Sequence, residues 1–197
     1  MSVEESCDVN PADEILCYGH PVLRGKAEPV QKVDAEVEAA IERMTTCLER
    51  AGGLGLAAPQ IGSRLRVIVY DVGDGPAAVI NPRLQDSEGA EESLEGCLSL
   101  PRLFGDVSRA ARVVVRGRDV RGRPIRIEAE DMLARVIQHE IDHLEGVLFV
   151  DRVNPETLHW LIGKGGQDEE AQRVPTTLAD ALKVFEARVA SRHRADG

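Results

Sequence analysis

The amino-acid sequence predicts an α+β domain with a helical extension at its C-terminal end. Two long segments have the apolar spacing of helices, several others resemble β-strands, and the two kinds do not alternate regularly. A doubly wound parallel sheet requires that alternation, so the order of segments disfavours it. The chain has 197 residues, 43% of them hydrophobic, which fits one ordinary domain with a short appendage.

The first predicted elements are a strand, a turn and a helix. Residues 15–18 read as a short strand, and Gly19-His20-Pro21 reads as a turn or the entry to a helix. Asp34 is a candidate N-cap for a helix that extends to about residue 50. Its apolar residues follow a spacing of three and four, which predicts one buried stripe. Gly52 and Gly53 are expected to end this helix.

The middle of the chain predicts strands. Residues 65–72 (LRVIVYDV) are rich in β-branched residues and predict a buried strand. Residues 77–81 form a second candidate, which Pro82 is expected to end. Residues 112–119 and 124–129 flank the turn sequence VRGR and predict a hairpin.

A second helix is predicted from Asp131 until Gly146. Its expected apolar side consists of Met132, Leu133, Val136, Ile137, Ile141 and Leu144. The composition changes after residue 152. Residues 164–170 resemble a polar linker and residues 178–189 an amphipathic helix. We therefore divide the chain into a main domain, 1–152, and an extension, 153–197.

Charge and cysteine content limit the function. The formal net charge is −10, from 24 Lys and Arg against 34 Asp and Glu, which disfavours general binding to nucleic acid but leaves a local basic patch open. We expect no secretory signal in residues 1–12 and no membrane span. The widely spaced cysteines favour a reducing cytoplasm over a disulfide framework; they are Cys7, Cys17, Cys47 and Cys97.

The second predicted helix contains the pattern H-E-x-x-H within Gln138-His139-Glu140-Ile141-Asp142-His143. His139 and His143 are four residues apart, so their rings project from one face and can bind one metal ion. Glu140 beside them can act on water. A solvated helix can also contain two histidines without a metal, but the strongly amphipathic setting favours a metal site.

A catalytic metal site of this kind needs a third protein ligand. In the pattern H-E-x-x-H-x-x-G-x-x-H that ligand would fall at Phe149, which cannot bind a metal. A downstream glutamate is weakly supported and stays open; the candidates are Glu156, Glu169, Glu170 and Glu186. Cys97 is the remaining option. An isolated cysteine usually fills a core, but beside two histidines its thiolate is a strong ligand for iron or zinc.

Three segments resemble the signatures of one enzyme family. They are Gly53-Leu54-Gly55-Leu56-Ala57-Ala58-Pro59-Gln60, Glu95-Gly96-Cys97-Leu98-Ser99 and Gln138-His139-Glu140-Ile141-Asp142-His143-Leu144-Glu145-Gly146. All three resemble peptide deformylases, in family order and without a mismatch at the defining positions. The surrounding similarity covers about residues 15–152, which makes this the expected catalytic domain.

The resemblance implies a cytoplasmic hydrolase that removes the formyl group from the N-terminal formylmethionine of nascent polypeptides and releases formate. It implies mixed or antiparallel sheets packed around a central H-E-x-x-H helix. It also implies one divalent metal ion, Fe(II) or a zinc, nickel or cobalt substitute, bound by Cys97, His139 and His143 with water in the fourth position. No other cofactor, membrane or sequence-specific nucleic acid is expected, while a transient ribosome contact stays open.

The family's catalytic roles map onto matching residues. By resemblance, Glu140 accepts the proton of the attacking water and passes it to the departing amine. The Gln60 side chain and the Leu98 backbone N–H would stabilise the oxyanion. The implied substrate-binding residues are Gly53, Leu54, Gly55 and Val136. Among them, the Gly55 backbone would bond the substrate main chain, while Leu54 and Val136 would line the methionine pocket.

The other chemically distinctive residues have ordinary structural interpretations. We expect His20 in a turn, His159 on a helix surface and His193 in a tail. We interpret Cys7, Cys17 and Cys47 as incidental or packing residues. Charge alone suggests that Arg109 pairs with Glu95, whereas the direction of the Arg135 side chain cannot be read from the sequence.

Two other functions would use part of the same sequence pattern. A zinc endopeptidase shares the two-histidine helix and Glu140 but leaves Cys97 and the Gly53-to-Gln60 segment unexplained. A degenerate fold retained as a ribosome- or peptide-binding module conflicts with the intact ligands and the intact glutamate. Internal cleavage of unblocked peptides would favour the first, and a metal-loaded protein without turnover the second.

Overall fold

The computed structural model of this chain describes residues 14–163 and 171–195, with side chains described up to residue 187. The residues 1–13, which include Cys7, and the expected linker at 164–170 lie outside the described residues, as does the side chain of His193.

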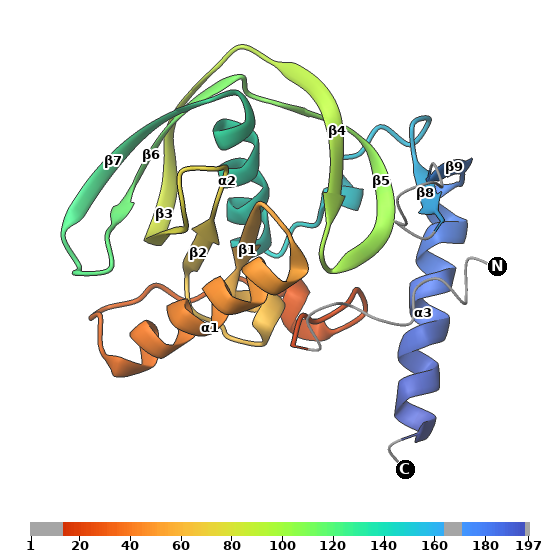
Figure 1. The fold of residues 1–197 in the computed structure, drawn as a ribbon, viewed down its shortest axis with the longest axis horizontal. Helices are drawn as coiled ribbons and strands as arrows, with labels where there is room; N and C mark the ends of the chain where they lie inside the picture. Colours follow the sequence, from red (N-terminus) through yellow and green to blue (C-terminus); the bar gives the residue numbers. More distant parts are fainter. Residues whose placement is uncertain (1–13, 164–170, 196–197) are drawn as a thin grey trace.

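Two antiparallel sheets and three α-helices form the described part of the molecule (Figure 1). The helices are α1 (Ala35–Ala51), α2 (Asp131–Leu144) and α3 (Leu178–Ala195). The five-stranded sheet, in spatial order, consists of β1 (Gly55–Ala57), β2 (Val67–Tyr70), β3 (Ala77–Glu88), β6 (Arg112–Arg118) and β7 (Pro124–Glu130). The four-stranded sheet consists of β4 (Glu91–Cys97), β5 (Leu100–Arg109), β8 (His159–Ile162) and β9 (Gln172–Pro175). The predicted α+β class is confirmed.

Helix α1 forms where the sequence predicts it. The Asp34 side chain accepts hydrogen bonds from the backbone N–H groups of Glu36 and Val37, which satisfies two of the donors that a helix leaves free at its start. The helix ends at Gly52, whose φ of 62° is left-handed and suits glycine. Met44 and Leu48 point into a cluster shared with β1 and β2, so α1 supports the strand that precedes Gln60.

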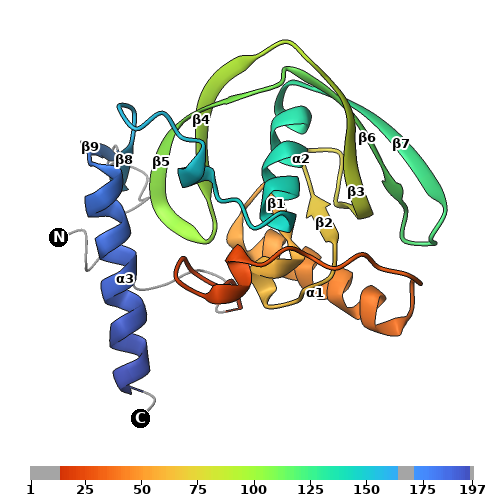
Figure 2. The same cartoon turned by 180° about the vertical axis from the view of Figure 1, so that it is seen from behind.

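Helix α2 begins at Asp131 as predicted and occupies the centre of the molecule. Its contacts include β1, β2, β3, β6 and β7, and both ribbon views show it enclosed by the two sheets (Figures 1 and 2). Ile137 and Leu144 are fully buried. Met132, which we expected on the buried side, is 50% exposed because it lies in the first turn at the edge of a cleft. Central burial lets α2 present polar side chains away from bulk water.

Two expectations for the strands are wrong. Residues 15–18 form no strand; the segment makes isolated bonds from Leu16 N to Gln60 O and from Tyr18 N to Ser99 O. Pro82 does not end β3, which continues to Glu88 through a register shift between Ile80 and Arg83. Proline lacks a backbone donor but is tolerated at such an irregularity.

The extension adds to the second sheet. Strand β8 pairs with β5, with Trp160 opposite Leu103, and α3 packs its Phe185 ring against Trp160 at 5.5 Å between centroids. His159 is therefore not on a helix surface as expected; it lies in β8 and is only 7% exposed. The division at residue 152 stays a prediction.

Within the described ranges, no helix combines the length and apolarity that a membrane crossing requires.

Candidate metal centre

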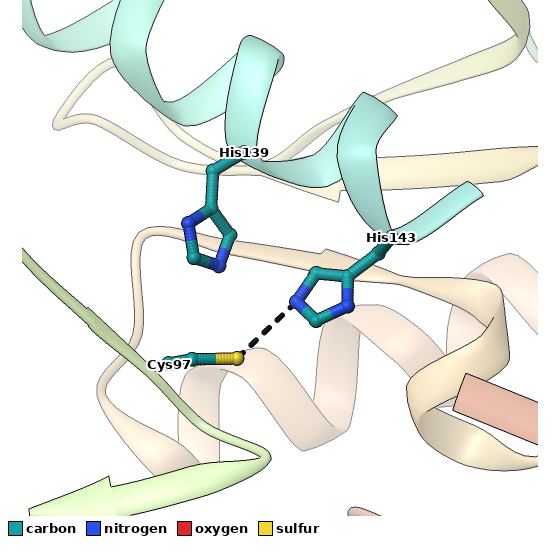
Figure 3. Close-up of side chains that lie close together, drawn as sticks. All are labelled: Cys97, His139 and His143. Carbon is teal, nitrogen blue, oxygen red and sulfur yellow. Dashed lines mark hydrogen bonds between the residues drawn. The ribbon is translucent and has the colours of Figure 1, made fainter. Parts of the chain in front are cut away.

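Cys97, His139 and His143 converge between β4 and α2. Cys97 is the last residue of β4, and the two histidines lie one turn apart on α2. Their ligand atoms all lie within 4.8 Å of one another, and no second such cluster occurs among the described residues. The Cys97 Sγ lies 3.2 Å from His143 Nε2, and the histidine ring centroids are 5.0 Å apart. Figure 3 shows the sulfur and both rings facing a common point.

The three side chains fit one divalent transition-metal ion. A thiolate and two imidazoles are the soft and borderline donors that iron and zinc accept. The Nδ1 of His139 is 2.9 Å from Glu95 Oε2, which leaves Nε2 to face the cluster. For His143, Nε2 is the atom that faces the sulfur. Three protein ligands leave one position of a tetrahedral site for water or substrate.

Glu95 connects His139 to two buried arginines. Arg109 Nε and Nη2 donate to the two Glu95 carboxylate oxygens at 2.5 and 2.9 Å, so the expected pairing is confirmed. Arg135 Nη1 donates to Glu95 Oε1 at 2.7 Å and to the Val107 carbonyl at 2.9 Å, which settles the direction of its side chain. Burial raises the pKa of Glu95, but hydrogen bonds from His139 and Arg109 outweigh it and lower that pKa to about 2. Glu95 is therefore ionised at neutral pH.

Arg109 also forms a hydrogen bond to helix α2. Arg109 Nη1 donates to Asp142 Oδ2 at 2.8 Å, and Asp142 lies between the two histidines in sequence. Arg152 donates to both Asp142 oxygens at 2.6 and 2.8 Å. The single bond from Arg109 holds the last turn of α2, and hence His143, against β5. The bidentate pair with Arg152 holds the same turn to the segment that follows the helix.

The pKa values of the two histidines are shifted in opposite directions. Burial lowers the pKa of His139, but hydrogen bonds to Cys97 and Glu95 outweigh it and raise that pKa above its usual value. Burial lowers the pKa of His143 well below its usual value, and the charges of His139 and Arg109 lower it further. A buried positive charge is thus already favoured at His139, the position where a cation would be bound.

Glu140 is buried from solvent beside the ligand cluster. Its residue is 3% exposed, and its Oε2 has no hydrogen-bond partner among the described residues. Burial raises the pKa of Glu140 to about 7, against the opposing charges of His139 and Arg109. A carboxylate with a pKa near neutrality can take up a proton and release it again.

Gln60 reaches the cluster from the opposite wall. Its Oε1 accepts from Ala57 N at 2.8 Å, and its Nε2 donates to Ser99 Oγ at 3.2 Å and faces Cys97 Sγ at 3.8 Å. Gln60 is 1% exposed. The amide is therefore oriented by its own turn, with its N–H groups directed at the cysteine segment.

A cleft of about 440 Å³ opens onto these groups. Its walls include Gln60, Cys97, His139 and Glu140, while His143 is 1% exposed and does not line it. Apolar side chains form most of the remaining wall; they are Leu54, Leu94, Leu98, Phe104, Met132 and Val136. Such a cleft suits a ligand with an apolar side chain next to a polar reactive group.

The structure brings together the predicted site residues and excludes the alternative ligands that it describes. Gly53, Leu54, Gly55, Leu98 and Val136 all line the cleft. Glu156 and Glu186 are not part of the ligand cluster, and Glu169 and Glu170 lie outside the described residues. The sequence did not predict that Ser99 accepts a hydrogen bond from Gln60, or that Asp142 accepts one from Arg109. The one signal that could have indicated these two residues is their position within the signature segments, close to Cys97 and His143.

Known proteins resemble both the sequence and the fold. The polypeptide deformylase family model matches residues 12–159. The peptide deformylase of Thermotoga neapolitana is 50% identical over 142 residues, covering 72% of this chain and 87% of that protein. The crystal structure of peptide deformylase from Thermotoga maritima has a TM-score of 0.70 at 46% identity, covering 72% of this chain and 97% of that one. The crystal structure of the Thermus thermophilus peptide deformylase has a TM-score of 0.68 at 37% identity and covers 92% of this chain and 95% of its own. That likeness therefore includes residues beyond 159.

Proposed function

Because this chain belongs to the peptide deformylase family, whose metal-dependent enzymes remove the N-formyl group from nascent peptides, we propose that its reaction takes place at the Cys97, His139 and His143 cluster. The observation that supports this most strongly is that the three ligand atoms lie within 4.8 Å of one another, with Cys97 and His139 in the wall of the cleft. The proposed catalytic domain comprises residues 1–152, and residues 153–197 form the extension.

We propose that one divalent ion binds the cluster, with Fe(II) as the native metal and zinc, nickel or cobalt as substitutes. The supporting chemistry is the donor set, since thiolate and imidazole nitrogen bind all four of these metals. When bound, the metal supplies a Lewis acid that polarises the formyl oxygen and acidifies water at neutral pH. We also propose a cytoplasmic setting and a transient ribosome contact during protein synthesis.

Glu140 handles the proton in the proposed mechanism. Water that attacks the formyl carbon gives a proton to the Glu140 carboxylate, whose raised pKa of about 7 suits this transfer. As the C–N bond breaks, Glu140 returns that proton to the departing amine. Formate and a free N-terminal amino group result. The burial of Glu140 keeps the proton from exchanging with bulk water during the reaction.

Gln60 and Leu98 stabilise the negative charge that develops on the formyl oxygen. The Gln60 Nε2 already faces the Cys97 sulfur, and the Leu98 N–H follows the cysteine directly in the chain. Because both donors are fixed before the reaction, little reorganisation is needed in the transition state. Gly53 and Gly55 let the substrate backbone approach closely, while Leu54 and Val136 offer apolar surface to the methionine side chain.

The decisive experiment combines metal analysis with formate release after anaerobic purification. We expect turnover of formyl-Met peptides and no cleavage within unblocked peptides. Cys97→Ala should lose tight metal binding, whereas Glu140→Ala should keep the metal and lose turnover. Cys17→Ala, which alters a cysteine outside the cluster, is the matched control. Full activity of Glu140→Ala would contradict the proposed proton transfer, and internal cleavage of unblocked peptides would favour the endopeptidase.

A further inference from the structure

Arg102 has an unusual backbone conformation beside the reaction centre. Its φ is 66°, in the left-handed region that residues with a Cβ rarely adopt. The other non-glycine residues with positive φ among those described are Asn81 and Asp131. Asn and Asp are the types that tolerate this region, because their short polar side chains bond locally. Arginine has no such compensation, so its presence here needs another reason.

The strand register directs this residue toward the cleft. Leu100 of β5 pairs with Cys97, but the next β5 residue paired with β4 is Phe104, opposite Gly96. Arg102 therefore lies in the register shift that directly follows a proposed metal ligand. Shifts of this kind re-aim side chains next to active sites. Arg102 lines the same cleft as Gln60 and Glu140.

The positive charge of Arg102 is not neutralised by the described part of the chain. Within the described ranges, its Nη1 donates to the Gly163 carbonyl at 3.1 Å, and no carboxylate there pairs with it. The other cleft-lining arginine, Arg135, is bound to Glu95. A guanidinium has five N–H donors, so Arg102 is anchored by one bond and keeps donors for a ligand.

We propose that Arg102 forms an anion subsite in the cleft wall that binds a carboxylate of the substrate peptide downstream of formylmethionine. This inference rests on the proposed function. The carboxylate belongs either to an acidic side chain or to the C-terminus of a short peptide. A planar guanidinium recognises both by paired N–H···O bonds. The subsite makes this enzyme selective among formyl-Met peptides by charge.

Matched peptides test the subsite. We would measure kcat/KM for formate release from formyl-Met-Glu-Ala-Ala-amide, formyl-Met-Ala-Glu-Ala-amide and formyl-Met-Ala-Ala-Glu-amide, each against its Gln counterpart. Formyl-Met-Ala-Ala as free acid and as amide tests the terminal carboxylate. At least one pair should favour the charged peptide by about threefold, as for a partly exposed ion pair, and high salt should reduce the ratio.

Substitutions of Arg102 separate charge recognition from structural support. Arg102→Gln should bring the ratio to about one, and Arg102→Glu should favour a Lys peptide over the Glu peptide. Arg102→Gly should abolish the ratio without lowering the melting temperature, because glycine accepts this φ without strain. Arg121→Gln, an exposed arginine in the β6–β7 turn, is the control that should keep the wild-type ratio.

Two failures are distinguishable. If no formyl-Met peptide releases formate, the proposed function itself is wrong. If neutral peptides are deformylated but charged and neutral pairs react equally, or if the ratio persists in Arg102→Gln, the subsite is wrong. A ratio retained in Arg102→Gly together with a lower melting temperature would assign Arg102 a purely structural role.

Discussion

The Nδ1 of His139 lies 2.9 Å from Oε2 of Glu95, and this contact decides which ring nitrogen faces Cys97. An ionised Glu95 accepts a hydrogen bond from Nδ1–H, so Nε2 is the nitrogen available to a metal. Because Arg109 and Arg135 hold Glu95 in turn, the orientation of one proposed ligand depends on a buried network rather than on its own rotamer.

Glu95→Gln should therefore weaken metal binding more than its distance from the metal suggests. Replacing the carboxylate by an amide removes the negative charge and one of the two oxygens that accept from His139, Arg109 and Arg135. Partners that orient a ligand in this way typically contribute about 10- to 100-fold in metal affinity. Titration with zinc against a competing chelator would measure the change. The exposed Glu91 on the same strand supplies the control, Glu91→Gln. Wild-type zinc affinity in Glu95→Gln would contradict the orienting role.

Metal affinity should also depend on pH in one direction. The raised pKa of His139 means that the metal-free protein holds a proton there at neutral pH, while His143, whose pKa is lowered, is neutral. A metal must displace that proton, so affinity should rise with pH, by up to about tenfold per unit for one proton. Zinc titrations between about pH 6 and about pH 8, in buffers of different ionisation enthalpy, would count the protons released. A flat pH profile with no proton release would contradict this assignment.

Gln60→Glu isolates the proposed oxyanion donor from the structural role of the same side chain. The substituted carboxylate keeps the oxygen that accepts from Ala57 N but replaces the donor Nε2 with an acceptor. We expect kcat to fall by roughly 100- to 1000-fold with little loss of metal, as when one such donor is removed. Gln85→Glu, at an exposed position of β3, is the control. Equal turnover by Gln60→Glu would exclude Gln60 from oxyanion stabilisation.

The elements with a strong local pattern were predictable, and those stabilised by distant partners were not. Asp34 capped α1 as expected because a cap needs only its own next turn. Strand β4 has a single buried residue, Glu95, and pairs with β5 across a turn, so its sequence lacks the alternation that marks a strand. His159 was misassigned because its strand exists through pairing with β5, a contact remote in sequence.

The candidate site shows the same limit. Two histidines on one helix face are a local signal, and the structure brings Cys97 to them from a different element. The pairing of Arg109 with Glu95 followed from charge alone. The second bond of Arg109, to Asp142, does not follow from charge alone, because many carboxylates in an acidic chain compete for one arginine. Only the packing of β5 against α2 selects between them.

Gly55→Ala should impair catalysis with little effect on folding or metal content. A Cβ at Gly55 would lie 2.5 Å from Glu140 Oε1 and 2.8 Å from Val136 Cγ1, and both distances are too short for real contacts. The backbone of β1 is extended and accepts alanine, so the strain must move the Glu140 carboxylate. A displacement of about 1 Å in a reacting group can reduce the rate by about 100-fold.

Formate release and metal content of Gly55→Ala, measured beside Gly25→Ala, would test this relationship. At Gly25 the nearest neighbour of an added Cβ is the Val22 carbonyl oxygen at 3.4 Å, an ordinary contact, and no group of the cleft is involved. Gly25→Ala should therefore keep wild-type kcat/KM. If Gly55→Ala also does so, the close packing of Gly55 on Glu140 has no catalytic importance. If instead Gly55→Ala loses its metal, the glycine acts on the ligands rather than on the proton-transfer group.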